Sequence, residues 1–392
     1  MDLFEKCFQF TEAKEAMEGG YYPYFLPLED TEGTEVVIRG QRLIMIGSNN
    51  YLGLTTHPKV RQAAIDAIKH YGPSCTGSRF LNGNLQLIME LEEKLARFMG
   101  KESALVFSTG FQTNLGAISS LVGRHDVVIT DKEDHASIVD GCRLSYGTMK
   151  RYKHNDAADL ERVLQSCPEN SGRLVVVDGV FSMGGDLADL PAIIPICKKY
   201  GAKLMVDDAH GVGIIGDARG TAVHYGVNDQ VDLIMGTFSK SFASLGGFLV
   251  GDEPVIHYIQ HLARSLIFSA SITPPNVAAA MASLEIMETE PERRERVLAI
   301  SERMGYEYRR MGYNIGNTVT PIIPIIIGER LSTVFLWQRL FQEGVYTNPV
   351  VEPAVPPGTC LLRTSYMATH TDEQMDQVLE TFERVGKEVG II

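Results

Sequence analysis

The 392-residue chain has few cysteines, a single tryptophan and no long apolar run. Its six cysteines are scattered and none forms a C-x-x-C pair, so the spacing of a zinc site or a dithiol motif is absent. No stretch reaches the roughly 18 apolar residues expected of a membrane-spanning helix. The N-terminus, Met1–Lys6, lacks the basic and apolar regions of a secretory signal. We therefore expect a soluble, cytoplasmic protein with reduced thiols and no metal site.

Basic residues are also in deficit. The chain has 36 Lys and Arg against 49 Asp and Glu, which gives a net charge of −13. Nucleic-acid-binding proteins present a basic face, so this balance argues against a nucleic-acid partner. A local basic site for a small anion stays compatible with it. The 44% hydrophobic content is that of a globular protein, and the length suits a large domain plus a smaller one.

The first part of the chain predicts an N-terminal segment, 1–55, followed by helices. This segment holds the aromatic cluster Tyr21–Phe25 and an extended piece at 35–39. Apolar residues then recur at helical spacing over 60–68 and 87–98, and the two patterns stop at Gly72 and Gly100.

From residue 101 onward, short apolar runs alternate with helical patterns, which predicts an α/β fold with a mostly parallel sheet between helices. The expected strands are 104–107, 127–129, 174–177, 204–206 and 233–235. We place a large domain at 56–285, with Pro274-Pro275 ending its core. A smaller α+β domain at 286–392 follows, with helices at 291–311 and 371–388 and extended pieces near 322–327 and 361–366.

Lys240 lies in the turn Thr237-Phe238-Ser239-Lys240-Ser241, directly after the last of these strands. A lysine in a turn is ordinarily a solvated surface charge. Here small and hydroxyl residues surround it, and Gly246-Gly247 leads back into an apolar strand. A partly desolvated lysine can form a Schiff base with pyridoxal 5′-phosphate (PLP).

Asp207 and His210 follow the apolar run 203–206. Asp207 could simply cap the next helix, and His210 could be a hydrogen-bonded core histidine. In a PLP site, a carboxylate at this strand end would instead hold the pyridine nitrogen protonated, and a nearby histidine would reach the phenolic oxygen.

Two further segments follow strands in the same way. Ser108–Asn114 places a glycine at a helix start, where backbone N–H groups and the helix dipole favour an anion. It could also be an ordinary strand-to-helix turn, but together with the hydroxyls of Thr237 and Ser239 it predicts a phosphate cradle. His135, after the strand near 126–130, could stack on the ring or face solvent at a helix start.

These motifs resemble those of the α-oxoamine synthases, fold-type I PLP enzymes that join an amino acid to an acyl-CoA with loss of CO2. The resemblance runs from about Ser48 to Thr371. It is carried by Asn49–Leu54, Gly77–Arg79, Ser108–Gln112, Asp134–Ser137, Asp178–Met183, Val206–His210, Gly236–Lys240 and Gly358–Arg363. Within the family, Gly77–Gly83, Gly236–Ser241 and Leu361–Ser365 resemble the bacterial serine palmitoyltransferases most.

The resemblance implies a role for each matched position. Lys240 would carry the PLP Schiff base and act as Cα base, Asp207 would pair with the ring nitrogen, and His135 would stack on the ring and polarise a developing oxyanion. With His210, these form the predicted catalytic set. The other predicted cofactor residues are Ser182 near the phenolic oxygen, Gly110, Phe111, Thr237 and Ser239 at the phosphate or ring edge, and Ser269 and Ser271 at the phosphate of a neighbouring subunit. Arg363 would bind the amino-acid carboxylate, with Asn50 and Thr359 as further substrate contacts.

The implied reaction condenses L-serine with palmitoyl-CoA in a homodimer with shared active sites. Residues 18–34 contain no Lys or Arg for a carboxylated acyl chain, and their aromatic residues favour a long apolar tail, although such a cluster could also be ordinary packing. A long-chain substrate would be compatible with weak membrane association. The alternatives are 8-amino-7-oxononanoate synthase, 2-amino-3-ketobutyrate CoA ligase and an inactive partner subunit, the last disfavoured by Lys240.

The chain departs from the family at three positions. The family usually has Asp-Glu-Ala-His-Ser, whereas this chain has Asp208 and Gly211. Phe111 stands where a tyrosine is common. None of these changes removes a group that the chemistry requires. Because 349–357 contains no arginine, Arg363 is the basic residue of that region available for a carboxylate.

Overall fold

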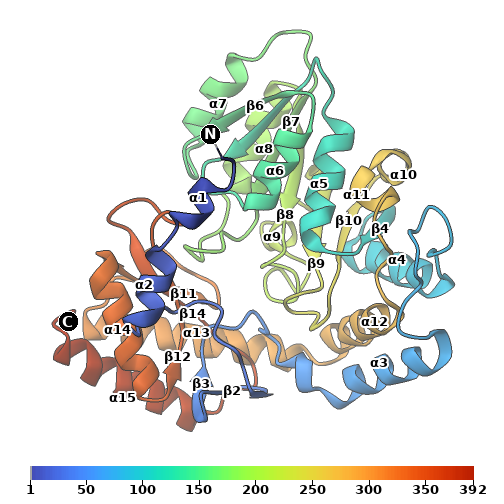
Figure 1. Ribbon diagram of the computed structural model, residues 1–392. Helices are drawn as coiled ribbons and strands as arrows, with labels where there is room; N and C mark the ends of the chain where they lie inside the picture. Colours follow the sequence, from blue (N-terminus) through green and yellow to red (C-terminus); the bar gives the residue numbers. More distant parts are fainter. Residues whose placement is uncertain (1) are drawn as a thin grey trace.

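A seven-stranded sheet forms the centre of the protein in the computed structural model, which describes residues 2–392 (Figure 1). The strands lie in the order β4 (Ser103–Phe107), β10 (Gly247–Gly251), β9 (Leu233–Thr237), β8 (Lys203–Asp207), β7 (Arg173–Asp178), β5 (Val127–Asp131) and β6 (Thr148–Tyr152). All neighbours are parallel except β10, which is antiparallel to β4 and β9. The predicted mostly parallel α/β sheet is confirmed, and so are the five strands expected from their apolar runs.

Strand β6 was not among the predicted strands. Its sequence, Thr-Met-Lys-Arg-Tyr, is polar because it is an edge strand, and only Tyr152 is buried. Edge strands commonly carry charged side chains, so hydrophobicity alone does not reveal them.

Helices cover both faces of this sheet, and alternate residues of each strand supply the two cores. In β7, Leu174 and Val176 face the core shared with helices α5, α6, α10 and α11, whereas Val175 and Val177 face the other. The first group comprises α5 (Gly110–Leu121), α6 (Ala136–Leu144), α10 (Glu253–Leu262) and α11 (Arg264–Ile267). Helices of the opposite core include α4 (Gln86–Met99), α7 (Ala157–Gln165), α8 (Leu190–Lys199) and α12 (Pro274–Thr289).

Glycines end the first two long helices, as predicted. Helix α3 (Pro58–Tyr71) stops at Gly72 and α4 stops at Gly100, and both glycines have positive φ. A residue without a Cβ adopts this conformation at little cost, so the chain can turn there.

The prediction that Pro274-Pro275 ends the core of the large domain was wrong. These prolines start α12, where missing N–H groups cost nothing, and α12 packs against α3 and α4.

The C-terminal part carries a three-stranded sheet, β11 (Ile322–Gly328), β14 (Cys360–Ser365) and β13 (Asn348–Val350), with helices α13 (Pro291–Met311), α14 (Arg330–Gln342) and α15 (Asp372–Glu388). The extended pieces and helices expected here are present. A second small sheet joins the two ends of the chain, because β3 (Gln41–Met45) pairs with β12 (Val345–Tyr346) as well as with β2 (Glu35–Ile38), which pairs with β1 (Asp30–Glu32). The predicted division at residues 55 and 285 stays a prediction.

Short elements complete the chain. They are α1 (Glu5–Phe8), α2 (Glu12–Glu18), α9 (Thr221–His224) and the 3-10 turns Leu54–Thr56 and Asn228–Gln230. Helix α2 lies along α14 (Figure 1), with Arg330 donating to Glu12 and Gln338 donating to the Gly20 carbonyl. Across residues 2–392, no helix combines the length and the apolar character needed to traverse a bilayer.

Candidate active site

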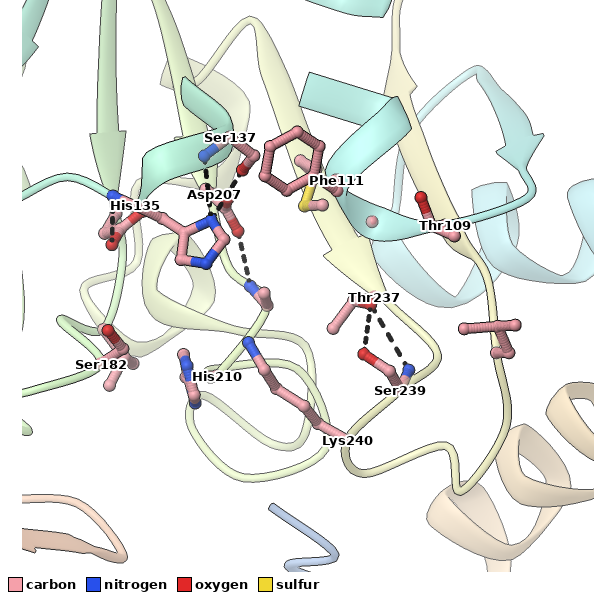
Figure 2. A pocket seen from close by; sticks show the side chains of 16 residues that line it. Thr109, Phe111, His135, Ser137, Ser182, Asp207, His210, Thr237, Ser239 and Lys240 are labelled. Atoms are coloured by element: carbon pink, nitrogen blue, oxygen red, sulfur yellow. Dashed lines mark hydrogen bonds between the residues drawn. The ribbon is translucent and has the colours of Figure 1, made fainter. Parts of the chain in front are cut away.

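A cavity of about 240 Å³ lies where strands β7, β8 and β9 end and helices α5 and α6 begin (Figure 2). This is the carboxyl edge of the parallel strands, the position at which open α/β sheets bind ligands. Most of the predicted cofactor residues line it: Gly110, Phe111, His135, Ser182, Asp207, His210, Thr237, Ser239 and Lys240.

Five predicted residues do not line this cavity: Arg363, which is described below, and four residues that make local contacts. The Ser271 hydroxyl donates to the Gly83 carbonyl, and Ser269 accepts a hydrogen bond from the side chain of Gln112. Asn50 caps its own turn, since its Oδ1 accepts from Leu54 N at 3.0 Å, and the Thr359 hydroxyl donates to Pro356 O. Within one chain, therefore, these four side chains serve local structure, and their predicted ligand roles stay predictions.

Asp207, the last residue of β8, is buried and accepts one hydrogen bond at each carboxylate oxygen. Ala209 N donates to Oδ1 at 3.0 Å, and Asn114 Nδ2 donates to Oδ2 at 2.6 Å. These two hydrogen bonds orient the carboxylate, which faces the cavity (Figure 2). Hydrogen bonds to the charged form favour it, which suits an acid that must stay ionised beside a protonated ring nitrogen.

The same amide nitrogen connects Asp207 to His135 through a serine. Asn114 Nδ2 lies 2.8 Å from Ser137 Oγ, and Ser137 Oγ lies 2.7 Å from His135 Nδ1. Because Ser137 accepts from the amide, its own hydroxyl hydrogen is free to go to Nδ1, which also accepts from Ser137 N. The neutral ring of His135 therefore carries its proton on Nε2. Burial lowers the pKa of His135, which keeps it neutral at pH 7.

A second carboxyl group, Asp178, faces the cavity from the end of β7, next to Asp207 in register. Its Oδ2 accepts from His135 N at 3.2 Å, and its buried Oδ1 has no partner among residues 2–392. Burial first, and then the charge of Asp207, raise the pKa of Asp178 well above its usual value. The raised pKa favours the protonated form of Asp178 next to the Asp207 carboxyl group.

Lys240 enters the cavity from the loop after β9, and its amine points toward the region of Asp207 and His210 (Figure 2). Burial lowers the pKa of Lys240 to about 8, an effect that Asp207 and Asp178 partly oppose. A substantial fraction of the amine is then neutral near pH 8, as a nucleophile or a proton acceptor requires.

Helix α5 starts at the cavity beside Thr237 and Ser239, and its N-terminus has donor groups that would suit an anion. Thr109 caps the helix by accepting from Gln112 N, which leaves the N–H groups of Gly110 and Phe111 without an intrahelical acceptor. The Thr237 and Ser239 hydroxyls lie 2.9 Å apart beside this end. An added Cβ on Gly110 would lie 2.7 Å from Thr237 Oγ1, so only glycine lets the helix approach this closely.

Arg363 lies on β14 and is buried, yet it forms no salt bridge with any acidic residue of the described chain. Its Nε donates to Ser182 O at 2.7 Å, and a terminal nitrogen donates to Asn49 Oδ1 at 3.1 Å. The Tyr51 hydroxyl bridges this region to His210 Nδ1 at 2.7 Å. A buried guanidinium without a carboxylate partner is a suitable binding site for a substrate carboxylate.

The structure explains two of the three departures from the family pattern. Asp208 is fully buried and turns away from the cavity, where its oxygens accept from Thr221 N and Thr221 Oγ1, each at 2.6 Å. An added Cβ on Gly211 would overlap Asp208 Oδ1. The short acid and the glycine are therefore linked changes.

These residues fit PLP. A helix N-terminus with two hydroxyls suits the phosphate, Asp207 and its donors suit the ring nitrogen, and Lys240 suits the aldehyde. Phe111 and His135 pack edge to face, with ring centroids 6.3 Å apart, and form one wall for the ring.

Comparison with known proteins agrees with this fit. A family model described as aminotransferase class I and II matches residues 41–382. The chain belongs to this family. It is 49% identical to the serine palmitoyltransferase of Sphingobacterium spiritivorum over 99% of this chain and 98% of that protein. It is 48% identical to the enzyme of Bacteroides thetaiotaomicron over 100% and 99% of the two chains.

A solved structure and a further sequence relative give the same result. A serine palmitoyltransferase structure from S. paucimobilis with a bound PLP–myriocin aldimine superposes with a TM-score of 0.97, at 37% identity and full coverage of both chains. An 8-amino-7-oxononanoate synthase from Geobacter sulfurreducens is 41% identical, over 97% of this chain and 98% of that protein. The predicted family, the fold-type I fold and the resemblance to bacterial serine palmitoyltransferases are confirmed.

Several residues of the site were missed at the level of sequence. Asn114 and Ser137 lie within motifs that were recognised, but nothing in their spacing shows that Asn114 donates to both Ser137 and Asp207. Tyr51 lies in the N-terminal segment, far from His210 in the chain. Asp178 follows a predicted strand and begins the Asp178–Met183 motif, but neither feature assigned it a role.

Proposed function

We infer that this chain is a PLP-dependent acyltransferase that condenses L-serine with a long-chain acyl-CoA such as palmitoyl-CoA. The products would be 3-ketosphinganine, CoA and CO2, the first step of sphingolipid synthesis. The observation that carries this inference is that Lys240 and Asp207 face one cavity in a chain that matches serine palmitoyltransferases over its whole length.

When bound, PLP would supply an electron-withdrawing ring that lets the amino-acid Cα lose a proton and, later, CO2. Asp207 would keep the ring nitrogen protonated through its fixed carboxylate. Lys240 would hold the group covalently and, once the amino acid has replaced it, accept the Cα proton at Nζ, because its pKa of about 8 leaves neutral amine available. His135 would direct Nε2–H into the cavity toward developing negative charge.

Arg363 would bind the carboxylate of L-serine and orient the amino acid. Its guanidinium is held by Ser182 O and Asn49, so it does not need to reorganise when the substrate arrives. His210, whose pKa burial lowers well below its usual value, would stay neutral beside Lys240 and Arg363 and thus add no further positive charge.

The N-terminal segment supports a long apolar acyl chain. Tyr21, Tyr24 and Phe25 are exposed, and the exposed fraction of Phe25 is 92%. These aromatic residues are therefore not buried within this chain and are accessible to an apolar ligand. Residues 18–34 contain no Lys or Arg, which disfavours an acyl group that ends in a carboxylate. The 8-amino-7-oxononanoate synthase alternative would require such an acyl group.

The assembly and location are also part of the proposal. A homodimer in which Ser269 and Ser271 reach the partner's cavity would explain why neither side chain enters the cavity of its own chain. All six cysteines are free, which supports a reducing cytoplasmic location, with weak membrane contact through the acyl substrate. Sedimentation of the purified protein tests the dimer, and fractionation of cells tests the location.

The deciding experiment measures CoA release by the PLP-loaded protein. L-Serine, glycine and L-alanine are each combined with acetyl-, pimeloyl- and palmitoyl-CoA. We expect turnover with L-serine and palmitoyl-CoA, and a change in the cofactor's visible spectrum on addition of L-serine. Preference for pimeloyl-CoA with alanine, or for acetyl-CoA with glycine, would reassign the chain to one of the two alternative enzymes. Failure to bind PLP at all would indicate an inactive subunit.

A further inference from the structure

His154, just after β6, contacts a carboxylate with each of its two ring nitrogens. Nδ1 lies 3.1 Å from Asp131 Oδ1, and Nε2 lies 3.0 Å from Asp186 Oδ2, with Glu133 Oε2 at 3.8 Å from the same nitrogen. The ring packs edge-on against Phe181 at a centroid distance of 4.4 Å. The side chain is about one-quarter exposed, whereas that of Asp131 is completely buried.

This arrangement requires a doubly protonated ring. A neutral imidazole donates through one nitrogen and accepts through the other. In one of the two contacts, an unprotonated ring nitrogen would then face a carboxylate oxygen, and neither atom could donate a hydrogen. The Asp131 carboxylate is fixed in place, since Oδ1 also accepts from Glu133 N and Oδ2 accepts from Asn155 N. His154 is therefore the cation between two acidic groups from different parts of the chain.

Asp186 belongs to the loop 181–187, which His154 and Asn155 attach to the large sheet. Asn155 Nδ2 donates to Asp186 Oδ2 and to the Leu187 carbonyl. The loop is closed by hydrogen bonds from Phe181 N to Asp186 O and from Gly185 N to Phe181 O. On its other side, the Gly185 carbonyl accepts from Thr320 Oγ1 at 2.9 Å, so the loop lies between β6 and the C-terminal part.

The same loop supports Arg363. The carbonyl of Ser182 accepts from Arg363 Nε at 2.7 Å, and Ser182 also lines the cavity. A change in the position of this loop would move the guanidinium that faces the substrate carboxylate. His154 does not line the cavity, so it would not contact a ligand bound there.

We propose that protonated His154 is a positioning residue, which holds the 181–187 loop against the sheet and through Ser182 fixes Arg363 for the substrate carboxylate. The groups that face the ring are Asp131 and Glu133 from the end of β5, Asp186 from the loop, and the uncharged ring of Phe181. No lysine or arginine of the described chain forms a salt bridge with any of these three acids.

The pH dependence follows from this charge. Burial by itself lowers the pKa of His154, but hydrogen bonds to Asp131 and Asp186 outweigh it and raise the value to about 10. A histidine whose pKa is higher in the folded state contributes stability that is complete below the unfolded value near 6.5. That contribution is lost as the pH rises through about 10. The loop is accordingly held across the neutral range and released in strong base.

The first test observes the ring of the wild-type protein without substrate. Two-bond ¹H–¹⁵N spectra of histidine-labelled protein at pH 8.5 are expected to show His154 doubly protonated. The signal is assigned by its loss in His154→Gln, or by its shift in Asp186→Asn should the first variant fail to fold. A neutral His154 ring at pH 8.5 would overturn the proposal.

The second test measures L-serine binding to PLP-loaded protein by its visible spectrum, and this arm rests on the proposed function. His154→Gln is expected to weaken L-serine binding about tenfold, because a displaced Arg363 would lose one charged hydrogen bond to the L-serine carboxylate. The KM for palmitoyl-CoA is expected to stay unchanged. The matched control, His125→Gln, should bind L-serine like the wild type. Unchanged L-serine binding in His154→Gln would overturn the positioning role, whereas failure of the wild type to bind L-serine would count against the proposed function alone.

Discussion

Asn114 Nδ2 donates to Asp207 Oδ2 at 2.6 Å and to Ser137 Oγ at 2.8 Å, so one amide group orients both the Asp207 carboxylate and, through Ser137, the His135 ring. Asn114 is fully buried on α5, and its Oδ1 has no partner within residues 2–392. The reversed amide would place Oδ1 against the Asp207 carboxylate, which is repulsive. The orientation of Asn114 is therefore set by its two acceptors.

Replacing Asn114 by leucine should weaken PLP binding. The change removes a charged hydrogen bond to Asp207 and the donor that orders Ser137, so we expect PLP affinity to fall roughly tenfold. Equilibrium dialysis of PLP against the apoprotein provides the measurement. Ser120→Ala, on the same helix but away from the cavity, is the control. Equal PLP affinity for Asn114→Leu and the control would contradict the assigned role.

Lys240→Ala should abolish turnover. The change removes the only lysine of the cavity lining, and with it the proposed attachment point of PLP and the proposed Cα base. CoA release from palmitoyl-CoA and L-serine should fall at least about a thousandfold, and the visible band of lysine-bound PLP should disappear. Lys6→Ala, in the exposed N-terminal helix α1, serves as the control. A Lys240→Ala variant with near-wild-type turnover would refute the assignment.

The rate at which apoprotein reacts with PLP should rise with pH through the pKa of Lys240, about 8. Only the neutral amine attacks the aldehyde, and its fraction increases about tenfold between pH 7 and pH 9 for such a pKa. Stopped-flow absorbance after mixing apoprotein with PLP gives this rate. An ordinary lysine would instead show a tenfold rise for every pH unit up to about 10. That second profile would exclude a lowered pKa for Lys240.

Arg363→Lys should impair recognition of the amino acid more than that of the thioester. Lysine keeps the charge but cannot contact Ser182 O, Asn49 and a carboxylate at the same time. We expect KM for L-serine to rise about ten- to a hundredfold, with KM for palmitoyl-CoA within about twofold of wild type. Steady-state kinetics with each substrate varied in turn measures both values. Parallel increases in both constants would indicate general damage to the site.

Gly211→Ala should destabilise the protein, although the family usually has a larger residue here. The new methyl group would overlap Asp208 Oδ1, and we expect a cost of about 1–3 kcal/mol in the free energy of unfolding. Denaturant unfolding measures this cost. Gly305→Ala, where an added Cβ meets its nearest neighbour at 3.6 Å, is the matched control.

The same pair provides an internal check by a double-mutant cycle. In an Asp208→Ala background, the overlapping oxygen is gone, so Gly211→Ala should cost much less than it does in the wild type. Equal costs in the two backgrounds would show that Asp208 and Gly211 are independent. Comparison of the two variants with Asp208→Ala alone separates this coupling from the lost hydrogen bonds to Thr221.

Local sequence patterns were enough to predict the fold class and most of the cavity lining. Continuous apolar strands such as 174–177 indicate burial on both faces of a parallel sheet, and strand ends then place Asp207, Thr237 and Lys240 at one edge. These inferences depend on local patterns and on a general rule of topology. They fail for β6, whose edge position removes the apolar pattern.

The way in which distant side chains combine depends on the packing of the folded chain. Asn114 and Asp207 lie 93 positions apart, and Tyr51 and His210 lie 159 apart, so no spacing in the chain could indicate either hydrogen bond. The hydroxyls of Ser271 and Thr359 bind carbonyl groups of their own chain, a choice that depends on packing rather than on residue type. Burial is likewise a property of the folded chain, and it lowers the pKa of Lys240. Arg363 is buried as well, and no acidic residue of the described chain forms a salt bridge with it.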